Sequence, residues 1–201
     1  MRQLDGTGLK RLHRAWRRRT AGRLALVLDA VQTPVNVGSI ARAAAAWRVE
    51  HLWLAAGSAP PTAPGARKTA LGTERYLTWS VADRGEDAVA EARAQGYLVV
   101  GLELADGAVP LHELDLAGRD VCLVLGHEDR GLAPATLAAC DRVAFLPLLG
   151  RVGSLNVAQA AAAALYEVRR QAWTAAVGTA LPDDGDPDDA DLGDELDDEP
   201  G

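Results

Sequence analysis

The sequence predicts an α/β fold in which a mostly parallel sheet is covered by helices on both faces. Short apolar segments of strand length alternate with alanine-rich or amphipathic helical segments along the chain. Several of these apolar segments are continuous, which is typical of strands buried on both faces. Strands that alternate with helices in this way favour parallel pairing over hairpins.

The first expected element is a basic helical arm over residues 1–23. It carries eight Lys and Arg residues against one acid, Asp5, a net charge of +7. Leu9, Leu12 and Trp16 recur at helical spacing among the cations of the segment LKRLHRAWRRR, which predicts a short amphipathic helix. The arm precedes a globular domain that we expect over residues 24–172.

The globular domain is expected to contain six strands and four helices. The strands are expected at 24–30, 51–56, 76–81, 97–104, 120–126 and 142–148. The helices are expected at 39–47, 88–95 and 134–139, followed by a long last helix that the stretch 150–165 opens and that runs to about residue 176. The segment 57–68 is rich in Pro and Gly and is a candidate lid or binding loop.

Length and charge restrict the remaining possibilities. The 201 residues, 48% of them hydrophobic, suffice for one sizeable core and are too few for two full domains. Residues 183–201 hold eleven acids and no base, which predicts a disordered acidic tail that solubilises the protein or competes with an acidic ligand for the arm. The net charge of −7 therefore belongs mainly to this tail and says little about partners.

The two cysteines and the apolar segments indicate a compartment. Cys122 and Cys140 lie in apolar runs and are expected to be buried thiols in a reducing environment. No apolar run approaches the length of a membrane span, and the N-terminus lacks the apolar segment of a secretory signal. We expect a cytoplasmic protein that does not bind membranes.

In such a sheet, ligands bind in the loops beyond the carboxyl ends of the strands, and three of these loops stand out. The candidate residues are Asn36, Gly38 and Arg42 in PVNVGSIAR, Gly126, Glu128 and Gly131 in LGHEDRGL, and Ser154 and Asn156 in LPLLGRVGSLNV. The first loop lacks the G-x-G-x-x-G pattern of dinucleotide-binding proteins, and the serine lacks the G-x-S-x-G elbow of hydrolases.

Each candidate also has a purely structural interpretation. Arg42 is compatible with a surface arginine and Asn36 with a turn. Glu128 and Ser154 are each compatible with the cap of a following helix. His127 has no other His or Cys at ligand spacing, so we expect no metal.

Taken together, the three loops resemble the three sequence motifs of the SpoU family of SPOUT methyltransferases. The patterns N-x-G-x-x-x-R, L-G-x-E-x-x-G and L-P-x-x-x-x-x-G-S-L-N-V occur in that order and span roughly residues 24–172. The segments KTALG at 68–72 and LYEVRRQ at 165–171, with the helical arm, are most similar to the TrmH branch, which methylates the ribose of a tRNA guanosine. Many relatives carry Asn or another small polar residue where this chain has His127.

The resemblance implies a fold and a reaction. The reaction is transfer of the methyl group of S-adenosylmethionine to a ribose 2′-hydroxyl of RNA, in the first instance the D-loop guanosine of tRNA. The alternatives are a ribose methyltransferase acting on rRNA and a non-catalytic RNA-binding protein on the same fold. The resemblance also implies a C-terminal trefoil knot and a homodimer.

The resemblance assigns roles to individual residues. The implied cofactor-binding residues are Leu125, Gly126, Leu146, Leu155 and Asn156. The implied catalytic residues are Asn36, Arg42, Glu128, Ser154 and Asn156. Because a guanidinium is normally always charged, we expect Arg42 to organise a phosphate and stabilise alkoxide charge rather than act as a base. Ser154 is expected to cap the last helix as well.

Positive charge indicates where the RNA backbone would bind. The candidate RNA-binding residues are Arg11, Arg14, Arg17, Arg18, Arg19, Arg67, Lys68 and Arg169. The alanines from Ala158 to Ala164 would let another backbone approach the last helix closely, whether from the sheet or from a second subunit.

Overall fold

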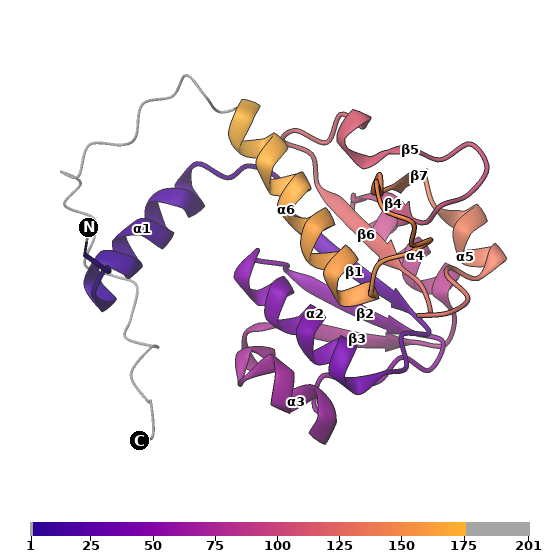
Figure 1. Ribbon diagram of the computed structural model, residues 1–201, viewed down its shortest axis with the longest axis horizontal. Coiled ribbons are helices and arrows are strands. Elements are labelled where there is room, and N and C mark those ends of the chain that lie inside the picture. The colour runs from indigo at the N-terminus through magenta and orange to yellow at the C-terminus, as the bar shows by residue number, and fades with distance from the viewer. Residues whose placement is uncertain (1, 176–201) are drawn as a thin grey trace. The chain divides into compact units, whose positions relative to one another are not determined.

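A computed structural model describes residues 2–175 of the chain. In this part of the chain seven strands form one sheet with the order β3-β2-β1-β6-β4-β7-β5 (Figure 1). The strands are β1 (Leu24–Asp29), β2 (His51–Ala55), β3 (Thr78–Ala82), β4 (Leu98–Leu102), β5 (Val109–Pro110), β6 (Val121–Leu125) and β7 (Arg142–Phe145). Every neighbouring pair in this sheet is parallel, which confirms the predicted α/β class.

Helices cover both faces of the sheet. They are α2 (Pro34–Ala46), α3 (Pro64–Ala70), α4 (Gly85–Ala94), α5 (Pro134–Ala139) and α6 (Val157–Ala175), with single 3₁₀ turns η1 (Thr73–Tyr76) and η2 (Leu111–Glu113). Helix α1 (Gly6–Arg18) belongs to a separate compact unit of the chain. Leu24, Leu26 and Leu28 of β1 pack in the core formed with α2 and α6, whereas Ala25 and Val27 pack in the core on the α4 side. This period-two alternation, with apolar residues on both sides, explains why β1 is a continuous apolar run.

The two central strands create a crevice at their carboxyl ends. The chain leaves β1 into α2 on one face of the sheet, and it leaves β6 toward α5 on the other face. Neighbouring strands whose connections diverge in this way mark a topological switch point, where ligands bind in open α/β sheets. The first two candidate loops therefore meet at this crevice.

Helix α1 forms as predicted and begins at Gly6, because the Asp5 carboxylate caps it by accepting a 2.8 Å hydrogen bond from the Gly8 backbone N–H. Leu9, Leu12 and Trp16 are exposed on α1, among its cations. The next compact unit begins at Thr20. Arg23, counted above with the arm, lies in that unit. Its Nε donates to Asp120 Oδ2 at 2.9 Å, and its guanidinium lies 4.5 Å from the centre of the Tyr97 ring.

Several element boundaries differ from the prediction. Helix α2 begins at Pro34, not at residue 39, because proline is well suited to the first helical position. Asn36 and Gly38 therefore lie in a helix and not in a loop. The second half of the predicted loop at 57–68 forms the start of α3, and the two-residue strand β5 was not predicted.

The remaining expectations concern the thiols and the tail. Both cysteines are free, with Cys122 fully buried in β6 and Cys140 half-buried. Burial raises the pKa of the Cys122 thiol well above its ordinary value. Among the described residues, no helix is both long and apolar enough to cross a membrane. The acidic tail at 183–201 lies outside the described residues.

Candidate functional site

The carboxyl ends of β1 and β6 bring the first two motif segments into direct contact. Asn36 lies in the first turn of α2, and Glu128 lies three residues after the end of β6. Glu128 Oε1 accepts hydrogen bonds from Asn36 Nδ2 and from the Thr33 backbone N–H, each at 3.0 Å. Glu128 therefore caps the start of α2, which follows β1, and not the helix after Gly131 that sequence reasoning considered.

The third motif segment joins the same network through Asn156. Its Nδ2 donates to Asn36 Oδ1 at 3.0 Å, and its Oδ1 accepts a 2.9 Å bond from the Ala158 backbone N–H. Asn156 is thus the cap of α6. The expected cap at Ser154 is wrong, because α6 begins at Val157, three residues further on. Three segments distant in sequence are linked by the hydrogen-bonded series Glu128, Asn36 and Asn156.

These contacts fix the charge state of Glu128. Its partial burial acts to raise the pKa of the carboxyl, but the hydrogen bonds from Asn36 and Thr33 stabilise the anion and lower the pKa to about 2. Glu128 is therefore ionised at any physiological pH. A carboxylate with so low a pKa is a poor proton acceptor near neutrality, so its role is to hold Asn36 and not to take a proton.

The loop that carries Glu128 is closed tightly on itself. The His127 N–H donates to Gly131 O at 3.0 Å, and the Gly131 N–H donates back to His127 O at 2.9 Å. A side chain on Gly126 would place its Cβ 2.2 Å from the Gly131 carbonyl carbon, so only glycine fits there. The His127 ring is part of this turn, because its Nδ1 accepts a 3.0 Å hydrogen bond from the Asp129 backbone N–H.

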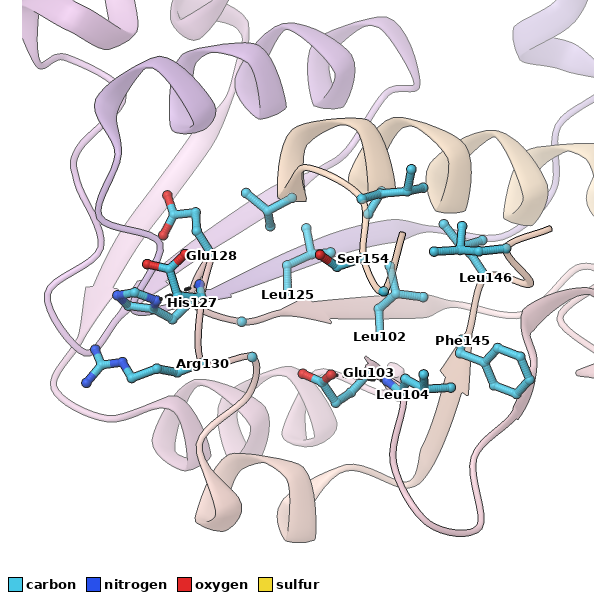
Figure 2. Close-up of a pocket in the computed structure, with 18 of the residues that line it drawn as sticks. Leu102, Glu103, Leu104, Leu125, His127, Glu128, Arg130, Phe145, Leu146 and Ser154 are labelled. Atoms are coloured by element: carbon cyan, nitrogen blue, oxygen red, sulfur yellow. Dashed lines mark hydrogen bonds between the residues drawn. The ribbon is translucent and has the colours of Figure 1, made fainter. Parts of the chain in front are cut away.

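A pocket of about 640 Å³ opens beside this loop, within the usual range for small-molecule sites (Figure 2). Four of the five predicted cofactor residues line it: Leu125, Gly126, Leu146 and Leu155. The fifth, Asn156, caps α6 and does not belong to the lining. Figure 2 shows Glu128, His127 and Arg130 at one end of the pocket and Phe145 and Leu146 at the other. Apolar walls with a few polar groups are typical of a cofactor pocket.

The structure assembles the predicted catalytic set only in part. Ser154 is exposed and lines the pocket, two residues before Asn156 in the chain. Arg42 is exposed on α2, and within residues 2–175 its guanidinium makes no hydrogen bond or ion pair with Glu128 or Ser154. In the same range, no group of three or more His, Cys, Asp or Glu side chains is placed to hold a metal ion.

Gly38, the second residue of the first motif, serves helix packing. A Cβ at this position would lie 2.0 Å from Ala66 O and 2.2 Å from Thr69 Oγ1. The glycine therefore allows α3 to lie directly against α2. Its place in the motif is explained by this close approach, since Gly38 does not contribute to the pocket lining.

Most of the predicted RNA-binding cations are exposed or partly exposed. These are Arg11, Arg14, Arg17, Arg18 and Arg19 on or just after α1, and Arg67 and Lys68 on α3. Arg169 was a wrong prediction: only 5% of its surface is exposed, and it donates to the backbone carbonyls of Gly22, Trp47 and Arg48. Its spacing from Leu165 and Ala172 places it on the buried face of α6, a signal that the sequence contained.

Glu103 was missed by sequence reasoning. It directly follows β4 and lines the pocket (Figure 2). Its Oε2 accepts a 2.8 Å bond from the Leu132 backbone N–H, and its Oε1 accepts from the Leu104 N–H at 3.1 Å. The signal was an acidic residue at the carboxyl end of a strand, the same rule that singled out Glu128.

Comparisons with known proteins identify the family to which the three motif segments belong. A model of the SpoU rRNA Methylase family matches residues 23–166. The 23S rRNA (guanosine-2′-O-)-methyltransferase RlmB of Acinetobacter baylyi is 36% identical over 149 residues, which cover 74% of this chain and 60% of the relative. The tRNA (guanosine(18)-2′-O)-methyltransferase of Escherichia coli is 33% identical over 156 residues, covering 74% of this chain and 63% of the relative.

A solved structure of an rRNA methyltransferase is also similar to this chain. The AdoMet-bound rRNA methyltransferase from Sinorhizobium meliloti superposes with a TM-score of 0.70 at 30% identity, covering 76% of this chain and 57% of that chain. The chain thus spans less than two thirds of the length of these relatives. The family match covers all three motif segments and the sheet that carries them. The chain belongs to the SpoU family of RNA methylases.

Proposed function

We propose that this protein is an S-adenosylmethionine-dependent RNA ribose 2′-O-methyltransferase that acts on tRNA. The observation that carries the proposal is the bonded set of Asn36, Glu128 and Asn156 at the edge of a pocket with apolar walls. Ribose methylation of rRNA is the alternative, because relatives named for each substrate match the chain to a similar degree. With tRNA or rRNA as its substrate, we expect the protein to act in the cytoplasm.

The pocket suits a nucleoside cofactor. Leu125, Leu146 and Leu155 offer apolar walls, and Gly126 presents only backbone atoms to the pocket. The ionised carboxylate of Glu128 adds negative charge that favours a cationic ligand. When bound, S-adenosylmethionine supplies a methyl group activated by a positively charged sulfur.

The protein must then hold the ribose oxygen in place and assist the loss of its proton, because a protonated hydroxyl is a poor nucleophile. Asn36 is suited to orient the ribose. Its Nδ2 has two N–H donors, of which one is used by Glu128, while its Oδ1 is used by Asn156. Within residues 2–175 the second N–H has no hydrogen-bond acceptor, so we assign it to an RNA oxygen. The ionised Glu128 fixes this orientation and keeps the amide from rotating.

Arg42 supplies the positive charge. Its guanidinium is a positively charged group exposed on the same helix as Asn36, so we assign it to an RNA phosphate and to the negative charge that develops on the ribose oxygen. Ser154, at the pocket wall, completes the set by contacting the RNA or Arg42. The arginines of α1, with Arg67 and Lys68 of α3, would bind the RNA backbone by charge.

The proposal includes a homodimer and a C-terminal trefoil knot, both expected from the family. The loop before α6 supports the dimer, since Leu149 is fully exposed and Val152 is 65% exposed beside the pocket. An exposed apolar loop of this kind favours cover by a second copy of the chain. Sedimentation at several protein concentrations tests this part of the proposal, and a monomer at all of them contradicts it.

The experiment is transfer of a labelled methyl group from S-adenosylmethionine to bulk tRNA and, separately, to rRNA, followed by digestion to nucleosides. We expect label in 2′-O-methylguanosine from tRNA. Label from rRNA alone supports the alternative substrate. Cofactor binding without label in either RNA indicates a non-catalytic RNA-binding protein.

A variant pair tests the role of Arg42. We expect Arg42→Ala to abolish turnover while S-adenosylmethionine still binds with unchanged affinity by calorimetry. Arg84→Ala is the matched control, because Arg84 is exposed at the start of α4 on the opposite face of the sheet. Turnover of Arg42→Ala close to that of the wild type contradicts the assignment.

A further inference from the structure

Two acidic side chains hold the segment that leaves the Glu128 loop. Glu103, at the end of β4, accepts a 2.8 Å hydrogen bond from the Leu132 N–H. Asp29, at the end of β1, accepts a 3.1 Å bond from the next backbone group, the Ala133 N–H. Consecutive peptide groups are thus tied to carboxylates from two strands on either side of β6. Only Glu103 belongs to the pocket lining.

Besides its hydrogen bond to Leu132, Glu103 packs directly against Gly131 of the loop. Gly131 has a φ of +67°, and a Cβ built on it would lie 2.1 Å from Glu103 Oε2. The Gly131 carbonyl carbon in turn lies against Gly126, where a Cβ would approach it to 2.2 Å. The Glu103 carboxylate therefore packs against Gly131, and Gly131 packs against Gly126 at the wall of the pocket.

The same loop presents Glu128 to Asn36. His127 and Gly131 are paired by two backbone hydrogen bonds, so a shift of Gly131 moves His127 and the residue after it. Glu103 itself is held in place, because its backbone N–H donates to Ala144 O of β7 at 2.9 Å. The rigid end of β4 is in this way connected to the loop through one side chain.

We propose that Glu103 is a positioning residue for the methyl-donor pocket, and that its carboxylate sets the conformation of the Gly126–Gly131 loop. The inference rests on the proposed function, since it assigns this residue to the pocket in which S-adenosylmethionine would bind. Glu103 acts through the loop and transfers no proton. It should therefore govern cofactor affinity more than the rate of methyl transfer.

The test compares Glu103→Gln with Asp29→Asn. Each replaces a carboxylate with its amide, and the two carboxylates hold adjacent peptide groups, but Asp29 faces the α4 side of the sheet. Calorimetry with S-adenosylmethionine should give a dissociation constant raised about tenfold for Glu103→Gln, the effect of one charge-assisted hydrogen bond. Asp29→Asn should lower the thermal midpoint and leave the dissociation constant within about twofold, since no contact to the pocket changes.

A double variant distinguishes a positioning role of Glu103 from a general loss of stability, because it measures whether the effects of substitutions at Glu103 and Gly131 on cofactor affinity are coupled. Gly131→Ala alone should weaken cofactor binding, because the new methyl group meets the carboxylate. In the Glu103→Ala background this clash is absent, and the strain of the positive φ is the same in both backgrounds. The loss caused by Gly131→Ala should therefore be several-fold smaller beside Ala at position 103.

The inference is overturned if Gly131→Ala and Glu103→Ala affect cofactor affinity independently. It is also overturned if Glu103→Gln and Asp29→Asn change that affinity equally. In steady-state assays, Glu103→Gln should raise the KM for S-adenosylmethionine and leave kcat nearly unchanged. If the wild-type protein binds the cofactor and the variants bind it equally well, only this inference fails. If the wild type does not bind it, the proposed function fails as well.

Discussion

Replacing Arg169 with leucine should be among the most destabilising single changes on α6. Arg169 is 5% exposed, and its guanidinium donates to Trp47 O, Gly22 O and Arg48 O at 3.0, 2.9 and 3.0 Å. These carbonyls lie at the end of α2 and at the entrance to β1. Burial lowers the pKa of Arg169, with a smaller effect from Arg48. Three backbone carbonyls accept hydrogen bonds from this buried charge, and the carboxylate of Glu50 stabilises it to a small extent.

The magnitude follows from these contacts. A hydrogen bond from a charged donor contributes about 1.5–3 kcal/mol, and bonds in one cluster do not add fully. Leucine would fill part of the volume but leave buried carbonyls unpaired. We expect a loss of about 3–5 kcal/mol in the free energy of unfolding, a large part of the stability of an ordinary domain, which is about 5–15 kcal/mol.

The assay is urea unfolding at one fixed protein concentration, so that association does not alter the comparison. Arg170→Leu is the matched control, because the neighbouring arginine pairs with Glu167 of the same helix at the surface, with 42% of its side chain exposed. The loss for Arg170→Leu should be much smaller. If Arg169→Leu is no more destabilising than Arg170→Leu, the structural role given to Arg169 is refuted.

Three further predictions test other parts of the structure. The pKa of Glu128 is about 2, against an ordinary value of 4.5. The contribution of this carboxylate to the free energy of unfolding is therefore complete above pH 4.5 and is lost as the pH falls toward 2. Unfolding of Glu128→Gln, measured over the same pH range, should lack this part of the pH dependence. Deleting residues 1–20 should weaken RNA binding and flatten its salt dependence, with cofactor affinity unchanged; a filter-binding titration that gives the same slope contradicts this. Gly38→Ala should cost about 1–3 kcal/mol in urea unfolding through the clash with Ala66 and Thr69, and full stability would show that α3 can move away.

The sequence was most informative where one physical rule dominated. Continuous apolar runs identified β1, β2 and β6 within one or two residues, because strands buried on both faces have no polar side. The three motif segments could be identified in the sequence, since ligands gather at the carboxyl ends of parallel strands. The expected helix at 39–47 began five residues too late, because proline also fits the first helical turn and α2 begins at Pro34.

Side-chain partners could not be predicted from the sequence in the same way. The role of Ser154 as a cap depended on where α6 begins, and Asn156 took that role because it lies next to the first helical residue. For Arg169 the helical spacing could have predicted burial, but its three partners, the carbonyls of Gly22, Trp47 and Arg48, could not be predicted, because they come from other parts of the chain. The contact of Glu103 with Gly131 could not be predicted either, because the two residues lie 28 positions apart in the chain.

The most direct test of the account is a crystal structure of this protein with S-adenosylmethionine bound. We expect the cofactor in the pocket lined by Leu125, Leu146 and Leu155, with Asn36 still bonded to Glu128 and Asn156. Density for the cofactor at any other place, or a pocket that stays empty at saturating concentration, would contradict the claim that three separate segments of the chain assemble a methyl-donor site.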